Sequence, residues 1–458
     1  MSKLRVAVIG AGPAGIYASD ILRKEAEGTH EVSIDLFDRL PAPYGLVRYG
    51  VAPDHPRIKG VVSALRGVLD TGGIRVFGNV DFGSDITLED LKERYNAVIF
   101  ATGAMRDAPL NIPGIDAEGS YGAADFVNWY DGHPDVPREW TLDAEHVAVV
   151  GNGNVALDVA RVLAKQADDM LPTEIPTNVY EGLKASKVTD VHVFGRRGPL
   201  QVKFTPLELR ELGEVPDSDL IVYEEDFDRD PAADEESKRN KQLLVISRIF
   251  GKWREQQDAL GNASRRIHLH FWSRPEAVLT NEAGRVTGIR MERTEPDGDG
   301  GIRNTGEMRD YEVGQVYRAV GYFGSPLEEI PYDPVNGVIP NHGGRVVDAA
   351  GNIVPGMFAT GWIKRGPVGL IGHTKSDAKE TIEHVLAGES GWWQPTITNE
   401  DEIVELLDER NVRYTDLEGW HNLDAHEVAL GEPQERERVK VVDREEMLGV
   451  SRGEDYSI

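Results

Sequence analysis

Cysteine is absent from this chain of 458 residues. Its absence excludes disulfides, thiolate metal ligands, iron–sulfur ligation and a CxxC redox pair. Any redox chemistry therefore needs a bound organic cofactor, and we predict no metal site.

Long apolar runs and basic side chains are also scarce. No run reaches the roughly 20 residues that cross a bilayer, and glycines at positions 10, 12 and 15 interrupt the apolar stretch 4–22. Fifty Lys and Arg stand against 78 Asp and Glu, for a net charge of −28. Such a chain repels nucleic acid and anionic membranes. We predict a cytoplasmic monomer that binds neither, and the length predicts two or three domains.

Glycine, by contrast, is abundant and grouped. The motif Gly10-Ala-Gly-Pro-Ala-Gly15 lies between an expected strand, 4–9, and an expected helix, 15–24. These glycines allow a tight turn, a close approach to a pyrophosphate and close helix–strand packing. The next strand, 32–37, ends at an acidic residue that suits ribose hydroxyls and repels a 2′-phosphate. We predict FAD or NAD contacts at Gly10, Gly12, Pro13, Ala14, Gly15 and Asp38. The alternative is a glycine-rich turn without a ligand.

A second motif of the same kind, Gly151-Asn-Gly-Asn-Val-Ala156, joins an expected strand, 146–150, to a helix, 155–165. The following strand, 190–194, runs into Gly195-Arg-Arg-Gly198, where two guanidinium groups suit a 2′-phosphate. We predict an NADP site at Gly151, Gly153, Ala156, Arg196 and Arg197. An exposed arginine pair on a turn is the alternative.

The chain thus has two expected dinucleotide sites, one ending at an acidic residue and the other at two arginines. This combination predicts an NADPH-dependent flavoprotein. A third glycine-dense turn, 359–372, could return to the first domain and approach the flavin. We also expect strands at 97–101, 315–322 and 356–361 and a helix at 376–386. Alternating runs at 266–272 and 284–293 predict antiparallel strands, and the acidic segment 214–236 predicts a solvated surface.

Several longer motifs resemble the adrenodoxin reductase family, and within it the FprA-type bacterial NADPH–ferredoxin reductases. They are Pro43-Tyr-Gly-Leu-Val-Arg48, Gly50-Val-Ala-Pro-Asp-His-Pro56, Gly151-Asn-Gly-Asn-Val-Ala-Leu-Asp158, Gly195-Arg-Arg-Gly-Pro-Leu-Gln201, Leu207-Glu-Leu-Arg-Glu-Leu212 and Trp362-Ile-Lys-Arg-Gly-Pro367. The resemblance covers essentially the whole chain. It implies an α/β protein of two Rossmann-like dinucleotide-binding domains, with a discontinuous FAD domain, 1–105 and 325–458, around an inserted NADP domain, 106–324.

The resemblance also implies an activity and further site residues. Hydride would pass from NADPH to FAD, and single electrons would pass on to a ferredoxin-type iron–sulfur carrier. FAD contacts are implied at Leu46, Val80, Trp362, Gly369, Leu370 and Ile371. NADP contacts are implied at Asn154, Val155, Arg196, Arg197 and Glu208.

Three titratable residues complete the candidate site. The resemblance pairs His55 with Glu211 beside the nicotinamide, where they would position the reactants, since hydride transfer needs no proton donor. Asp158 could face the same site and hold a water. Equally, Asp158 could be a carboxylate favoured by the positive end of its helix.

Alternative functions stay open. The chain could be an NADPH oxidase or a monooxygenase-like flavoprotein, or a catalytically silent dinucleotide-binding module. An electron-input subunit like those of glutamate synthase would carry iron–sulfur cysteines, which are absent here.

Because this chain is acidic and ferredoxins are commonly acidic, an electron carrier needs a local basic patch. The candidates are Arg210, Lys238, Arg239, Lys241, Arg248, Lys252 and Arg254. A solvated helix surface is the alternative.

Overall fold

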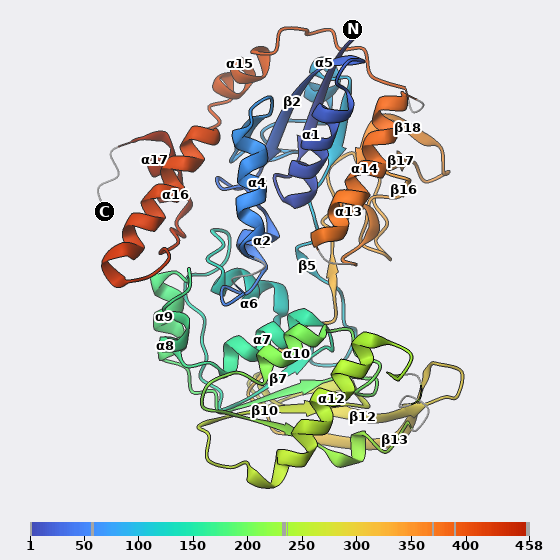
Figure 1. Cartoon of the computed structure of the whole chain (residues 1–458), viewed down its shortest axis with the longest axis vertical. Helices are drawn as coiled ribbons and strands as arrows, with labels where there is room; N and C mark the ends of the chain where they lie inside the picture. The colour runs from blue at the N-terminus through green and yellow to red at the C-terminus, as the bar shows by residue number, and fades with distance from the viewer. Residues whose placement is uncertain are drawn as a thin grey trace. The chain divides into compact units, whose positions relative to one another are not determined.

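The computed structural model describes residues 2–55, 59–230, 235, 237–368, 371–388 and 391–454. The chain divides into two compact units. Unit 1 comprises Met1–Arg106, Asp131–Asp135 and Tyr322–Ile458, and unit 2 comprises Asp107–Tyr130 and Val136–Gly321. Each unit is described separately below (Figure 1).

Unit 1 is built on a seven-stranded sheet of order β16-β17-β18-β4-β1-β2-β3. The central strands β18, β4, β1, β2 and β3 are parallel, and β16 and β17 add an antiparallel edge. The strands are β1 (Ser2–Ile9), β2 (His30–Asp38), β3 (Arg75–Gly78), β4 (Ala97–Phe100), β16 (Asn341–His342), β17 (Arg345–Val347) and β18 (Ile353–Ala359).

Helices cover both faces of this sheet. Successive residues of β1 face opposite sides: Val6 and Val8 join a core with residues of α1, α4 and α14, whereas Ala7 and Ile9 join a core with residues of α5 and α15. Burial on both faces explains why these strands read as nearly continuous apolar runs. The helices of this unit are α1 (Pro13–Glu25), α2 (Leu46–Tyr49), α4 (Val61–Asp70), α5 (Leu88–Arg94), α13 (Trp362–Arg365), α14 (Ile371–Ala387), α15 (Glu402–Glu409), α16 (Leu417–Gly431), η3 (Glu432–Gln434) and α17 (Arg444–Arg452).

Unit 2 contains a six-stranded parallel sheet of order β6-β14-β7-β8-β10-β9 and a three-stranded antiparallel sheet of order β11-β12-β13. Residues of both sheets form one apolar core, so the smaller sheet covers one face of the larger. The strands are β6 (Ser120–Gly122), β7 (His146–Val150), β8 (Asp190–Phe194), β9 (Ser218–Val222), β10 (Arg265–His270), β11 (Ser273–Thr280), β12 (Val286–Pro296), β13 (Ile302–Tyr311) and β14 (Gln315–Arg318).

The helices of unit 2 include the one that follows the second glycine motif. They are α6 (Ala123–Tyr130), α7 (Asn154–Ala164), α8 (Ala167–Met170), α9 (Thr177–Lys184), α10 (Pro206–Leu212), η1 (Glu224–Asp226), α12 (Lys241–Gln256) and η2 (Gln257–Ala259). Two short strands, β5 (Arg106–Asp107) and β15 (Tyr322–Phe323), pair separately. The expected α/β fold class with two Rossmann-like strand–loop–helix units is confirmed.

Two expectations were wrong. The run 266–272 contains β10, which pairs in parallel with β8 and β9, because alternation reports which residues face a core and not the direction of the neighbouring strand. The acidic segment 214–236 is not simply a solvated surface, since it contains β9 and η1. It also contains Asp226, a buried residue that accepts a hydrogen bond of 2.6 Å from buried Arg293. Residues 231–234 and 236 lie outside the described residues.

In the described part of the chain, no helix has the length and apolarity to cross a membrane.

Candidate dinucleotide-binding sites

The first glycine motif forms a tight turn at the carboxyl end of β1. Gly10 has a φ of +112°, and its N–H donates to the carbonyl of Phe37 in β2 at 2.7 Å. A Cβ at position 10 would lie 2.4 Å from the carbonyl oxygen of Ala101, and one at Gly15 would lie 1.9 Å from that of Gly10. Both positions therefore exclude a side chain: position 10 because the turn passes closely by the end of a neighbouring strand, and position 15 because α1 packs closely on the turn.

The turn leads directly into the N-terminus of α1. Gly12 is the N-cap residue, Pro13 takes the first helical position, and no side chain caps the helix. Uncapped N–H groups at the positive end of a helix form a site for a pyrophosphate. Ala14, in the same turn, lies against the residue that precedes α13, because a Cβ at Gly361 would lie 2.6 Å from the Cβ of Ala14.

Asp38 closes β2 and holds the glycine turn in place. Its Oδ2 accepts the N–H of Ala11 at 2.6 Å, and its Oδ1 accepts the N–H of Leu40 at 2.9 Å. Burial raises the pKa of this carboxyl, against the opposing effect of the two backbone hydrogen bonds. Each carboxylate oxygen retains a second acceptor position, so the group can also accept ribose hydroxyls.

A second turn, which the sequence analysis did not place, lies against the glycine loop. The N–H of Tyr44 donates to the carbonyl of Ala11 at 2.8 Å, and Tyr44 and Gly45 both have positive φ. Leu46 then begins α2 and is half-buried. Val80 is buried, and its N–H donates to the backbone carbonyl of Asp38 at 2.9 Å. Two residues expected to contact FAD thus lie on segments fixed to the first loop.

The third glycine-dense turn belongs to unit 1. Gly361, with a φ of +75°, precedes Trp362 at the start of α13, and its N–H donates to Oδ2 of Asp377 in α14 at 2.6 Å. Trp362 is half-buried. Of the remaining expected FAD contacts, Gly369 and Leu370 lie outside the described residues, and Ile371 begins α14 with a side chain that is not described.

The second glycine motif, in unit 2, reproduces the geometry of the first. The N–H of Gly151 donates to the carbonyl of Phe194 in the next parallel strand at 3.0 Å, as Gly10 does with Phe37. A Cβ at position 151 would lie 2.2 Å from the carbonyl oxygen of Ala319. Gly153 is the uncapped N-cap residue of α7, Val155 is half-buried in its first turn, and buried Ala156 takes the third small position. The two motifs are therefore structural equivalents.

The two arginines after β8 differ in their surroundings. The backbone of their loop is held by β10 and β11. The N–H of Gly195 donates to the backbone carbonyl of His270, and the N–H of Ser273 donates to the carbonyl of Gly195. The guanidinium group of Arg196 is exposed, and among the described residues it has no hydrogen-bond or ion-pair partner. Arg197 is half-buried, and its Nη1 donates to the carbonyl of Gly300 at 3.1 Å.

The first turn of α7 also positions α10. The amide oxygen Oδ1 of Asn154 accepts the N–H of Thr205 at 2.9 Å, and the Thr205 hydroxyl in turn accepts the N–H of Glu208 at 3.3 Å. Thr205 is thus a capping residue for the helix that carries Glu208 and Glu211. Asn154 therefore has a structural role besides any contact with a nucleotide.

Asp158, Glu208 and Glu211 meet around one buried cation that the sequence analysis missed. Nη1 of Arg161 lies 3.0 Å from Oδ1 of Asp158, 3.7 Å from Oε2 of Glu208 and 4.0 Å from Oε2 of Glu211. Arg161 is 1% exposed. The only sequence signal was its spacing of three residues from Asp158, which places both on one face of α7.

His55 lies in unit 1, where its side chain is buried. Its backbone N–H donates to the carbonyl of Ala52 at 3.1 Å. Because Glu211 belongs to unit 2, their pairing stays a prediction.

Comparisons with known proteins agree with this architecture. A family model described as pyridine nucleotide-disulphide oxidoreductase matches residues 4–198. The chain is 35% identical to the mitochondrial NADPH:adrenodoxin oxidoreductase of Arabidopsis thaliana, over 98% of this chain and 95% of that protein. It is 36% identical to the NADPH-ferredoxin reductase FprA of Mycobacterium tuberculosis, over 98% and 99% of the two chains. A solved structure of M. tuberculosis FprA in complex with NADPH matches with a TM-score of 0.90 at 35% identity, covering 98% of this chain and 100% of that one. The resemblance seen in the motifs is confirmed: this chain belongs to the adrenodoxin reductase family, which includes the FprA-type NADPH–ferredoxin reductases.

Proposed function

We propose that this chain is a cytoplasmic, monomeric flavoenzyme that takes hydride from NADPH onto FAD and passes single electrons to a ferredoxin-type carrier. One observation carries the proposal: two structurally equivalent glycine loops end at opposite charges, Asp38 in unit 1 and Arg196 with Arg197 in unit 2. The first excludes a 2′-phosphate and the second attracts one. Since the chain has no cysteine, electrons cannot pass through a protein dithiol.

FAD fits the first loop. Positions 10 and 15 leave no room for a Cβ, the first turn of α1 is uncapped, and Asp38 keeps acceptor positions for a ribose. The residues proposed to hold FAD are Gly10, Gly12, Pro13, Ala14, Gly15, Asp38, Leu46, Val80, Trp362, Gly369, Leu370 and Ile371, in segments 1–105 and 325–458. When bound, a flavin accepts a hydride pair and releases electrons one at a time.

NADP is assigned to segment 106–324. Gly151, Gly153, Val155 and Ala156 shape the pyrophosphate loop, Asn154 fixes α10 to it, and Arg196 and Arg197 bind the 2′-phosphate. The carboxylates of Asp158, Glu208 and Glu211 are held by Arg161 and orient the nicotinamide half of the coenzyme. We assign His55 a positioning role in the same reaction, since hydride transfer needs no proton donor.

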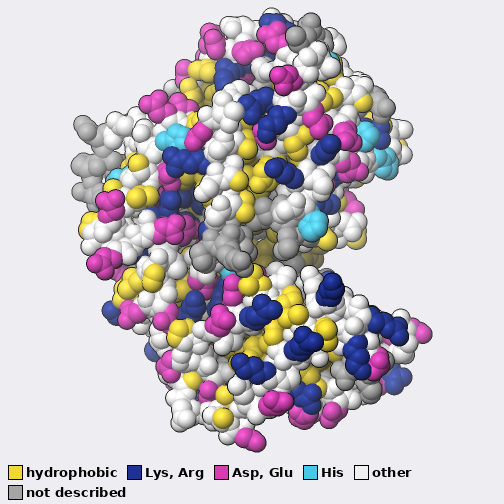
Figure 2. Space-filling model, in the orientation of Figure 1, with side chains coloured by type: hydrophobic (Ala, Val, Ile, Leu, Met, Phe, Trp, Pro, Cys, Tyr) yellow, Lys and Arg dark blue, Asp and Glu magenta, His cyan; other side chains and the backbone are white. Residues whose placement is uncertain are grey.

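A basic surface on unit 2 suits an acidic electron carrier. Arg210, Lys241, Arg248 and Lys252 are exposed, and among the described residues none of them has an ion-pair partner. Their helices, α10 and α12, pack together, and Figure 2 shows Lys and Arg side chains gathered over this face of the unit. Lys238, Arg239 and Arg254 flank the surface, but Lys238 pairs with Glu235 and Arg254 pairs with Glu224.

The function is tested by spectroscopy and turnover. The purified protein should be yellow, anaerobic NADPH should bleach its flavin absorption, and NADPH-driven reduction of cytochrome c should depend on added ferredoxin. A colourless protein would favour the silent dinucleotide-binding module. Rapid NADPH consumption with oxygen and none with ferredoxin would favour an oxidase.

A further inference from the structure

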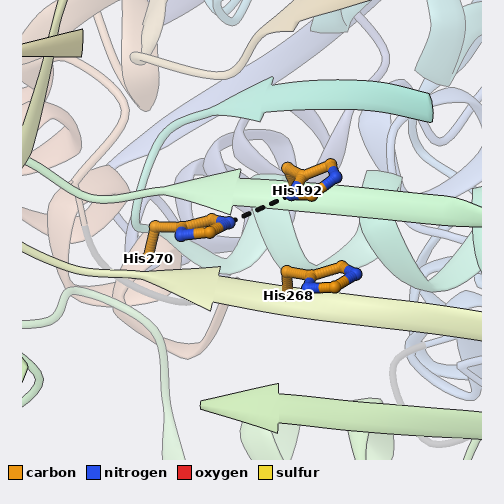
Figure 3. Close-up of side chains that lie close together, drawn as sticks. All are labelled: His192, His268 and His270. Atoms are coloured by element: carbon orange, nitrogen blue, oxygen red, sulfur yellow. Dashed lines mark hydrogen bonds between the residues drawn. The ribbon is translucent and has the colours of Figure 1, made fainter. Parts of the chain in front are cut away.

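Three histidine rings lie together in unit 2. His192 comes from β8, and His268 and His270 come from the adjacent parallel strand β10 (Figure 3). All three point to the same face, because their positions differ by two residues or pair directly in register. One ligand nitrogen from each ring lies within 4.8 Å of those of the other two. We propose that these histidines form a binding site for one zinc ion.

The pair His192 and His270 has the spacing that zinc needs. Nδ1 of His192 and Nε2 of His270 lie 3.0 Å apart and point toward each other (Figure 3). Two nitrogens bound to a tetrahedral zinc ion at about 2.0–2.1 Å lie about 3.3 Å from each other. A separation of the two rings by a few tenths of an ångström therefore makes room for the ion, and zinc replaces the hydrogen bond between them.

His268 is oriented as a metal ligand usually is. Its Nε2 lies 3.0 Å from Oδ1 of Asp190, and the same carboxylate oxygen lies 2.5 Å from Nε of Arg266 in an ion pair. An ionised carboxylate only accepts, so Nε2 carries the proton and Nδ1 is the acceptor. Metal-bound histidines typically donate the other ring N–H to a carboxylate in this way. The hydroxyl of Tyr223, 2.9 Å from Nδ1, is the donor that zinc would displace.

The rings are shielded from solvent, since His270 is buried and His192 and His268 are half-buried. A neutral imidazole binds zinc through one ring nitrogen. A pocket lined by Tyr223, Glu225, His270, Arg309, Asp310 and Tyr311 adjoins the cluster and provides an entry path. The nearby cations Arg266 and Arg309 are each paired, with Asp190 and Glu225 respectively.

The experiment is a zinc titration of the full-length protein after chelator treatment, measured by competition with a chromophoric zinc indicator. We expect one zinc per chain, and at least tenfold weaker binding in His192→Phe and in His270→Phe, which keep an aromatic ring but lose the nitrogens. His342→Ala, an exposed histidine in unit 1, is the matched control and should bind as wild type does. Unchanged circular dichroism in the absence of metal would show that the variants fold.

Two further measurements address the ligand set. Tyr223→Phe should bind zinc more tightly, because its hydroxyl no longer competes for Nδ1 of His268. X-ray absorption of the zinc-loaded protein should show at least three nitrogen ligands at about 2.0 Å. The proposal is overturned if both phenylalanine variants bind zinc as tightly as wild type, or if the absorption spectrum shows mainly carboxylate and water oxygens. Weaker binding by Tyr223→Phe would remove His268 from the site.

Discussion

We expect coenzyme choice to depend on the two arginines after β8, and to depend on them unequally because their surroundings differ. The guanidinium group of Arg196 is exposed and has no described partner, whereas Arg197 already donates to the carbonyl of Gly300. Arg196 can therefore be oriented entirely by the 2′-phosphate. A charge-assisted hydrogen bond contributes about 1.5–3 kcal/mol, and each 1.4 kcal/mol is about tenfold in affinity. Because solvent weakens an exposed pair, the lower end of this range applies to Arg196.

We expect Arg196→Ala to raise the KM for NADPH about tenfold. Arg197→Ala should raise it somewhat less, because part of that side chain's hydrogen bonding serves the turn at Gly300. If the two contributions add, the KM of the double variant for NADPH should be roughly a hundredfold above that of wild type. Steady-state assays with ferricyanide as acceptor should show KM for NADH within about twofold of wild type in every variant, since NADH has no 2′-phosphate.

The matched control is Arg290→Ala, which removes an exposed arginine of the same unit that pairs with Asp310 on the three-stranded sheet. It should leave both coenzymes unaffected. Equal losses with NADPH and NADH in the Arg196 variant would refute the reasoning, because they would show that the side chain supports the fold of the loop and does not bind the phosphate.

Three further predictions follow from the same structure. His55→Gln and Glu211→Gln should each retain bound FAD but slow flavin reduction by NADPH in anaerobic stopped-flow, and an unchanged rate would remove them from the active site. Reversing Arg210 and Lys241 to Glu should slow ferredoxin reduction at low salt and flatten its salt dependence while leaving ferricyanide reduction unchanged; ferredoxin turnover equal to wild type would exclude this surface. Burial raises the pKa of Asp107 to about 6, so its charged form opposes folding as the pH rises through about 4 to 6. Asp107→Asn should therefore stabilise the protein by about 3 kcal/mol at pH 7.5 and by little near pH 4, and a gain that does not change with pH in thermal unfolding would contradict this.

Much of this protein's fold could be predicted from the local sequence. A strand, a glycine turn and a helix are contiguous in the chain. The steric need for glycine arises at positions 10 and 151 from the residues that follow neighbouring strands, Ala101 and Ala319, and at position 15 from the carbonyl of Gly10 in the turn itself. The two dinucleotide motifs were therefore predictable from spacing, whereas the family and its two-domain fold class were predicted from the resemblance of the longer motifs. The charge that ends each motif, at Asp38 and at Arg196, is also local, because it lies at or just after the end of the next strand.

What the tertiary structure decided depends on residues far apart in the chain. Alternation predicted that 266–272 forms a strand, but only pairing with β8 and β9 makes it parallel. Arg161 lies among three carboxylates because Asn154 and Thr205 bring α10 against α7. The histidines at 192 and 270 meet for the same reason, since parallel pairing across some 78 residues sets them side by side. Contacts between different strands or helices carry no signal in the local sequence, because the packing of one element against another, and not the spacing of residues within it, determines which side chains share a site.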